Sequence, residues 1–264
     1  MSPKNLAFIL LIAPALAGAQ SSSPPVVQDN SFLMEEAYNQ ETGIVQHIFT
    51  FRTFRGSSDF DGAFTQEWPV GSIRHQLSYD LPLVRLGDET GVGDISLNYR
   101  YQLKGTGDTQ LAISPRFSVS LPTGDWKRGR GAGAAGFEAA VPVSYVISPL
   151  FTTHTNIDAG FTPSARNFSG ARANAFGISL GQSLIFTPNQ RVQPLVEIVY
   201  SREQEVVATD KTEWTDDLVV SPGVRAAFNF ASGLQIVPGI AVPLGRHDER
   251  GVFFYLSFEH PFKK

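Results

Sequence analysis

Residues 94–104 read DISLNYRYQLK, and residues 111–121 read LAISPRFSVSL. In both stretches apolar and polar side chains alternate. In the first stretch, one face of the strand carries Ile95, Leu97, Tyr99, Tyr101 and Leu103. A period of two is typical of a β-strand with one face against an apolar medium and the other against water. The two stretches therefore predict β-structure rather than helix.

The same alternation recurs from Ile44 to the end of the chain. It predicts about twelve strands, joined alternately by short turns and longer loops, as in bacterial outer-membrane barrels. The expected strands are 44–54, 62–69, 71–82, 93–104, 109–121, 136–147, 150–161, 174–187, 191–203, 216–229, 233–243 and 250–262. The sequence thus predicts an all-β fold, a transmembrane up-and-down antiparallel β-barrel over residues 44–264. Both chain ends and the short turns would face the periplasm.

A secreted β-sandwich is the competing fold, because its strands also alternate. Its apolar faces would need a second sheet to cover them. The polar faces here carry many Gly, Ala and Ser residues, which suit a crowded barrel lumen better than an open surface. On the barrel interpretation, the side chains of Leu97, Phe117, Ile178 and Leu180 contact lipid.

The N-terminus is typical of a cleavable secretory signal peptide, residues 1–19. Lys4 precedes an apolar run, and Ala17-Gly18-Ala19 forms a small-residue cleavage site. The run is too short for a membrane helix, which needs roughly 20 apolar residues. Residues 20–43 are then a periplasmic N-terminal segment, with a short helix expected at 31–41. Its apolar residues 32–34 either plug the barrel mouth or belong to a disordered lead, and the sequence leaves this open.

The composition limits the kinds of partner that we expect for this protein. The chain has 21 basic and 25 acidic residues and no cysteine, so we expect no nucleic-acid partner, which usually needs a basic face. No metal or cofactor motif is evident. The expected partners are outer-membrane lipids of a Gram-negative-type bacterium, the barrel-assembly machinery during biogenesis, and a small-molecule solute.

Charged residues on the polar faces are the candidate pore lining. Strand parity directs these side chains into the lumen: Arg52, Arg74, Arg100, Arg116, Glu138, His154, Asp158, Glu197 and Arg225. Most of the basic residues lie on the first five strands and the acidic ones on later strands. We therefore expect a basic arc facing an acidic arc across the lumen.

Two other functions stay open. A tight turn at 148–149 would place Ser144 opposite His154, a nucleophile and base pair that would suit a lipid or ester hydrolase. A closed structural barrel without transport is the other alternative. We expect a channel or uptake pore for small molecules, not an enzyme.

Several stretches resemble the outer-membrane proteins described as putative MetA-pathway of phenol degradation, a transporter-like family. They are SFLMEEAYNQETGIVQH (31–47), GVGDISLNYRYQL (91–103), SPRFSVSLPTGDWKRGRGAG (114–133), VSYVISP (143–149) and HTNIDAGF (154–161). The resemblance implies a barrel and passage of small molecules, with aromatic compounds as one class. It carries over no catalytic residue.

Overall fold

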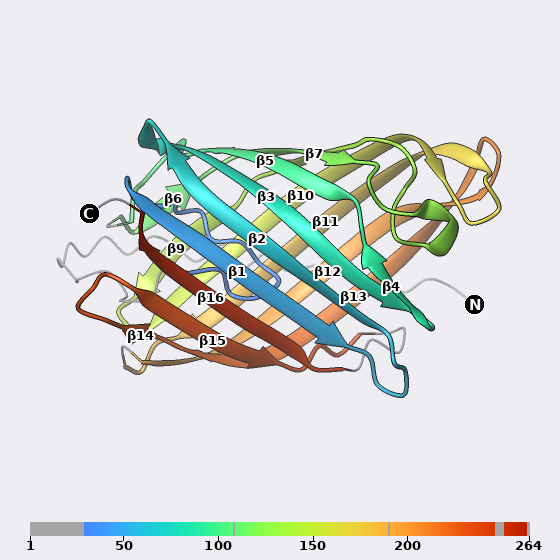
Figure 1. Cartoon of the computed structure of the whole chain (residues 1–264). Coiled ribbons are helices and arrows are strands. Elements are labelled where there is room, and N and C mark those ends of the chain that lie inside the picture. The colour runs from blue at the N-terminus through green and yellow to red at the C-terminus, as the bar shows by residue number, and fades with distance from the viewer. Residues whose placement is uncertain (1–28, 108, 190, 246–250, 263–264) are drawn as a thin grey trace, which may run out of the picture.

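The computed structural model describes residues 29–107, 109–189, 191–245 and 251–262 as one closed β-barrel (Figure 1). The expected signal peptide and residues 20–28 lie outside the described residues. Among the described residues, no helix is long and apolar enough to cross a membrane. The one 3-10 helix described, η1, spans Trp126–Arg128.

Strands make up the wall. They are β1 (Ile44–Thr53), β2 (Phe60–Val70), β3 (Ser72–Leu86), β4 (Glu89–Val92), β5 (Ile95–Tyr101), β6 (Leu111–Ile113), β7 (Arg116–Leu121), β8 (Gly136–Ala140), β9 (Val143–Ser148), β10 (Phe151–Arg166), β11 (Arg172–Phe186), β12 (Val192–Ala208), β13 (Lys211–Ala226), β14 (Phe228–Asn229), β15 (Gln235–Ala241) and β16 (Phe253–Pro261).

Neighbouring strands pair antiparallel around the barrel, and β16 pairs with β1 to close it. Four of the sixteen strands continue a neighbouring strand in the chain, namely β4 with β5, β6 with β7, β8 with β9, and β13 with β14. The wall therefore has twelve spans, which confirms the predicted fold. Two of the interruptions contain Pro115 and Pro142, which have no N–H group to donate to the ladder.

The outer surface of the barrel is apolar. Leu97 and Phe117 are 50% and 49% exposed, and Ile178 is 51% exposed. Exposed Phe, Leu, Ile and Val side chains cover the outward positions of nearly every strand, whereas many inward positions carry polar groups. This is the dyad pattern of a barrel that crosses a lipid bilayer, and it confirms the predicted orientation of these faces.

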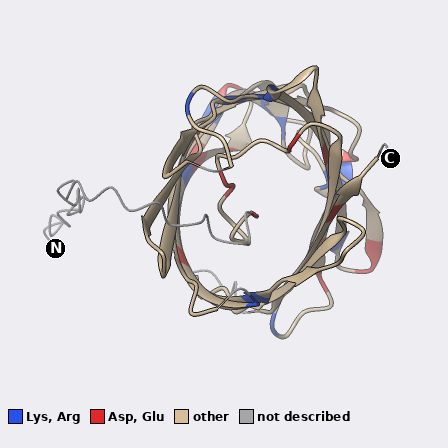
Figure 2. Cartoon of the chain, turned by 90° about the vertical axis from the view of Figure 1, so that its left-hand side faces the viewer, with Lys and Arg blue, Asp and Glu red and all other residues tan. Residues whose placement is uncertain are grey.

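Residues 29–43 lie inside the ring of strands, as the view along the barrel shows (Figure 2). The helix expected at 31–41 is wrong, because the structure has bends and irregular backbone there. Side chains of the barrel wall take up the backbone N–H and C=O groups of this segment, in place of the internal hydrogen bonds that a helix would need. We call residues 29–43 the lumenal segment.

Candidate functional site

The lumenal segment is held at its innermost turn by one carboxylate of the wall. Oε1 of Glu197, on β12, accepts hydrogen bonds from the backbone N–H groups of Phe32, Leu33 and Met34 at 2.9, 2.8 and 3.2 Å. Consecutive N–H groups that converge in this way form an anion-binding nest. Glu197 is fully buried, so the N–H groups of the segment, rather than water, bind its Oε1.

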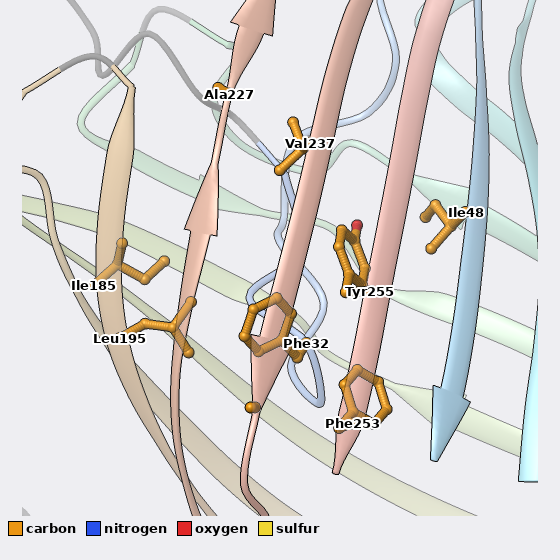
Figure 3. Packing of buried hydrophobic residues seen from close by; sticks show 9 residues of the cluster. Phe32, Ile48, Ile185, Leu195, Ala227, Val237, Phe253 and Tyr255 are labelled. Atoms are coloured by element: carbon orange, nitrogen blue, oxygen red, sulfur yellow. The ribbon is translucent and has the colours of Figure 1, made fainter. Parts of the chain in front are cut away.

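Phe32 occupies an apolar seat on the inner wall (Figure 3). Its ring lies 5.3 Å from the ring of Tyr255 and 5.9 Å from that of Phe253, measured between centroids. Gly239 and Gly223 make room for it, since a Cβ added at either glycine would collide with the Phe32 ring. Gly181 makes similar room for Met34.

The sequence analysis missed this seat, because it treated the inward faces as uniformly polar. Phe32 belongs to a buried apolar cluster, whose other members are Ile48, Ile185, Leu195, Ala227, Val237, Ala241, Phe253 and Tyr255. The alternation of the strands could have predicted this cluster. Ile185, for example, shares a face with Gly181 and Ser183, which the alternation already directed inward.

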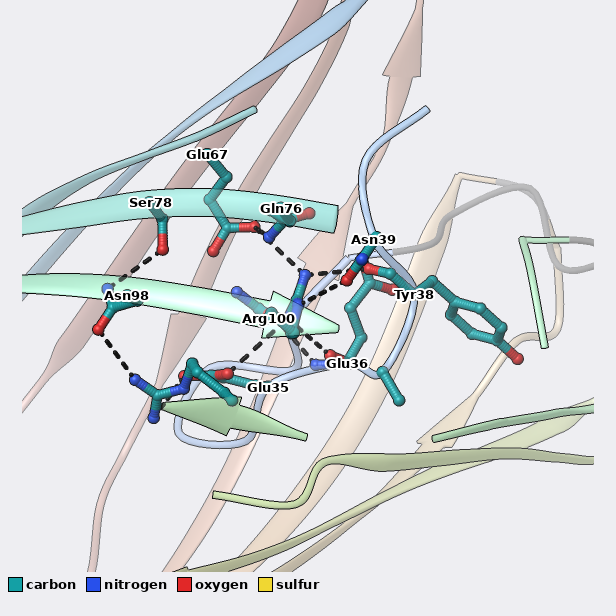
Figure 4. A network of polar contacts seen from close by, with 12 residues as sticks. Glu35, Glu36, Tyr38, Asn39, Glu67, Gln76, Ser78, Asn98 and Arg100 are labelled. Atoms are coloured by element: carbon teal, nitrogen blue, oxygen red, sulfur yellow. Dashed lines mark hydrogen bonds and ion pairs between the residues drawn. The ribbon is translucent and has the colours of Figure 1, made fainter. Parts of the chain in front are cut away.

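Arg100 anchors the other half of the lumenal segment (Figure 4). Its guanidinium donates to the side-chain oxygen of Asn39 and to the backbone carbonyls of Glu36 and Tyr38, at 3.0, 3.0 and 3.1 Å. It also lies 3.4 Å from a carboxylate oxygen of Glu67. Arg100 is 3% exposed, so it serves to bind the segment and does not face open water.

Arg225 also anchors the lumenal segment, at the point where the segment enters the barrel. Its guanidinium donates to the carbonyls of Asp29 and Asn30, and to Oε1 of Gln193 at 2.8 Å. Tyr255 donates its hydroxyl to the Asp29 carboxylate at 2.6 Å. Inward amides could have signalled such docking, because glutamines recur on the polar faces near the short turns: Gln46, Gln76, Gln102 and Gln193.

The remaining candidate pore residues do not form two opposed arcs. Arg52 pairs with Asp61 at 2.6 Å, and Arg116 pairs with Glu138 at 2.7 Å. Arg74 is exposed on β3, near the short turn between β2 and β3. The expected basic arc is wrong, because inward acids lie among the same first strands: Asp61 and Glu67 on β2, and Asp80 on β3.

Ser144 and His154 face each other across β9 and β10, in the register that the tight turn predicted. Ser144 Oγ lies 2.7 Å from His154 Nδ1, and it accepts the Ala37 backbone N–H at 2.7 Å. Both side chains are almost fully buried beneath the lumenal segment. His154 Nε2 has no hydrogen-bond partner among the described residues. In this arrangement the pair supports the segment, and no ester could reach the Ser144 oxygen.

Cavities lie beyond the tip of the lumenal segment, toward the long loops. Two of them, of about 190 and 280 Å³, adjoin Leu33, Met34 and Glu35. Another, of about 630 Å³, lies between the long loops beside Trp126 and Phe168. Space therefore remains in the lumen between the long loops and the segment tip.

Two motifs of the sequence resemblance meet at the long-loop end of the barrel. The Asp94 carboxylate accepts the backbone N–H groups of Gly124 and Ala132, at 2.8 and 2.7 Å. Any side chain at Gly124 would collide with the Arg130 carbonyl. The Gly-x-Gly-Asp sequence at 91–94 and the Pro-Thr-Gly-Asp sequence at 122–125 thus fix the course of the loop after β7.

Comparison with known proteins agrees with this geometry. The family model described as putative MetA-pathway of phenol degradation matches residues 21–236. The chain belongs to this family. No curated protein matches the chain.

Solved structures share the family's barrel fold. The outer-membrane channel COG4313 from Pseudomonas putida has a TM-score of 0.59 and 14% identity, over 85% of this chain and 97% of that one. The NanC porin has a TM-score of 0.52 and 9% identity, over 83% of this chain and 100% of that one. The KdgM porin has a TM-score of 0.51 and 10% identity, over 83% of this chain and 99% of that one. This chain therefore has the fold of outer-membrane channels.

Proposed function

We propose that this barrel is a passive outer-membrane channel for small molecules, with the lumenal segment as a plug of its periplasmic half. The observation that supports it most is the set of cavities that lie in the lumen between the long loops and the segment tip. A purely structural barrel has no need for such a space, because small barrels are usually filled by side chains. The family description points to aromatic compounds as one class of solute.

Conductance in a planar bilayer tests the channel and the plug together. Deletion of residues 29–41 removes the bonds to Glu197, Arg100 and Arg225, so single-channel conductance should rise at least severalfold. A folded deletion variant that conducts no better than the intact protein would remove the plug proposal. If neither protein conducts, the closed structural barrel is the correct description.

A point variant tests the plug without shortening the chain. Gly239→Ala adds one methyl group where the Phe32 ring lies, so the segment tip must move and conductance should rise. Gly160→Ala is the matched control, since a Cβ there would meet only the Phe137 carbonyl oxygen, at 3.9 Å. Equal conductance of the two alanine variants would contradict the proposed seat.

A further inference from the structure

The 280 Å³ cavity beside the segment tip is unusually acidic. Four carboxylates line it, from Glu35, Glu138, Asp158 and Glu203, against a single guanidinium, from Arg116. The formal charge of the lining is therefore four negative charges less one positive, or −3. Low-dielectric walls focus such a field into the space between them.

The guanidinium does not neutralise the whole cavity. Arg116 pairs with Glu138 at 2.7 Å and with Glu35 at 3.2 Å, which uses its charge on one side. Asp158 accepts a hydrogen bond from the Ser179 hydroxyl, at 2.8 Å, and has no ion pair among the described residues. Glu203 likewise has no ion pair within the described part of the chain.

A second, independent feature points to a donor that is missing from this cavity. Asn156 lines the cavity and is 3% exposed, and its Oδ1 has no hydrogen-bond partner among the described residues. A buried amide oxygen without a partner is costly. A ligand with N–H groups would satisfy it.

Much of the remaining lining is apolar. Leu33 and Met34 project from the segment tip, and Val199 lies on β12, the strand that also carries Glu203. The cavity thus offers acceptors and negative charge from the wall and from Glu35, together with an apolar surface at the segment tip. Its volume of about 280 Å³ is just below the ~300–1,000 Å³ of typical ligand pockets, which suits a molecule of one ring or a short chain.

We propose that this cavity binds small organic ammonium ions, with the charged nitrogen among Asp158, Glu203 and Asn156 and the apolar body against the segment tip. The inference builds on the proposed channel and gives it a preference among solutes. The channel would concentrate primary amines, aromatic amines included, over carboxylates of the same size. This preference is opposite to the one that a basic arc would have produced.

Calorimetric titration of the intact protein in detergent tests the site with three probes of one shape. Benzylammonium should bind saturably, whereas benzoate and benzyl alcohol should not. Asp158→Asn, Glu203→Gln and Asn156→Ala should each weaken binding about tenfold, from lost charge or a lost acceptor. Glu213→Gln, on the exposed part of β13, should leave it unchanged and serves as the matched control.

Several results would overturn the inference. They are the absence of saturable benzylammonium binding, equal binding of benzyl alcohol or benzoate, or full affinity in the Asp158 and Glu203 variants. Heat-shifted gel mobility shows whether each variant is folded, and Glu203 is exposed enough to tolerate substitution. Conductance separates the two proposals. A barrel that binds benzylammonium without conducting refutes only the channel, and one that conducts without binding it refutes only this site.

Discussion

A single acceptor atom, Oε1 of Glu197, fixes the turn of the lumenal segment. It receives three backbone N–H groups from a part of the chain about 165 positions away. Hydrogen bonds to a charged group contribute about 1.5–3 kcal/mol each. The wall thus holds the segment through the backbone, so the turn depends on Glu197 more than on which side chains occupy positions 31–34.

Glu197→Ala should therefore release the turn while the barrel remains folded. We expect hydrogen exchange of the amides of residues 32–34 to accelerate by at least tenfold, because they lose their acceptor. Mass spectrometry of the exchanged peptides measures this. Glu213→Gln, which lies on an exposed strand end, should leave the exchange unchanged. Protection that survives in Glu197→Ala would mean that Phe32 packing alone holds the turn.

The lumenal segment as a whole responds to protonation. Burial raises the pKa of Glu36 well above its usual value of 4.5, and nearby Asp29 raises it further, while Arg100 and Arg225 oppose the shift. Burial likewise raises the pKa of the Asp29 carboxyl. Docking therefore takes up protons, since both acids hold them more tightly inside the barrel than in water.

Docking of the segment should weaken with rising pH. A raised pKa contributes stability that is present below the ordinary value of 4.5 and is lost as the pH rises through the shifted one. Conductance measured from acidic to alkaline pH should increase. Glu36→Gln, which stays neutral, should flatten the profile. A conductance that falls with rising pH in the intact protein would contradict this sign.

At the scale of the whole barrel, the two faces of one strand should tolerate charge differently. Leu180 faces outward and is 37% exposed, whereas Ser179 faces the lumen and bonds to Asp158. An arginine on the lipid face near the midplane costs roughly 2–4 kcal/mol. Leu180→Arg should lower the denaturant midpoint for unfolding in lipid vesicles, and Ser179→Arg should reduce conductance instead. Equal midpoints for the two variants would contradict the assigned faces.

The barrel wall followed from sequence because alternation is a local signal. The strand pattern of 94–104 and 176–186 needs only the period of two, and a lipid-facing surface enforces it at each residue. The lumenal segment could not be predicted in the same way. Its backbone is ordered by Glu197, Arg100 and Arg225, which lie far away in the chain, and residues 31–41 lack a local pattern that distinguishes a helix from a docked loop.

The pairing of charges in the lumen could not be predicted from the sequence either. Parity placed Arg52 and Arg116 inward, but it does not reveal which acid lies beside each one. Arg52 meets Asp61 because the register of β1 and β2 puts them opposite one another. Register depends on turn geometry, which strand periodicity alone does not fix.

The pairing of β1 with β16 also has a consequence for how the chain folds. Gln46 and Ser257 form a hydrogen bond across this seam, although 211 positions separate them. The other strand pairs of the barrel join spans that are neighbours in sequence. Closing so long a loop costs free energy that grows only as about (3/2)RT ln n, but contacts of high sequence separation form slowly. Hairpins from β2 to β15 can therefore assemble one after another. The seam between β1 and β16 forms only when the two ends of the chain meet.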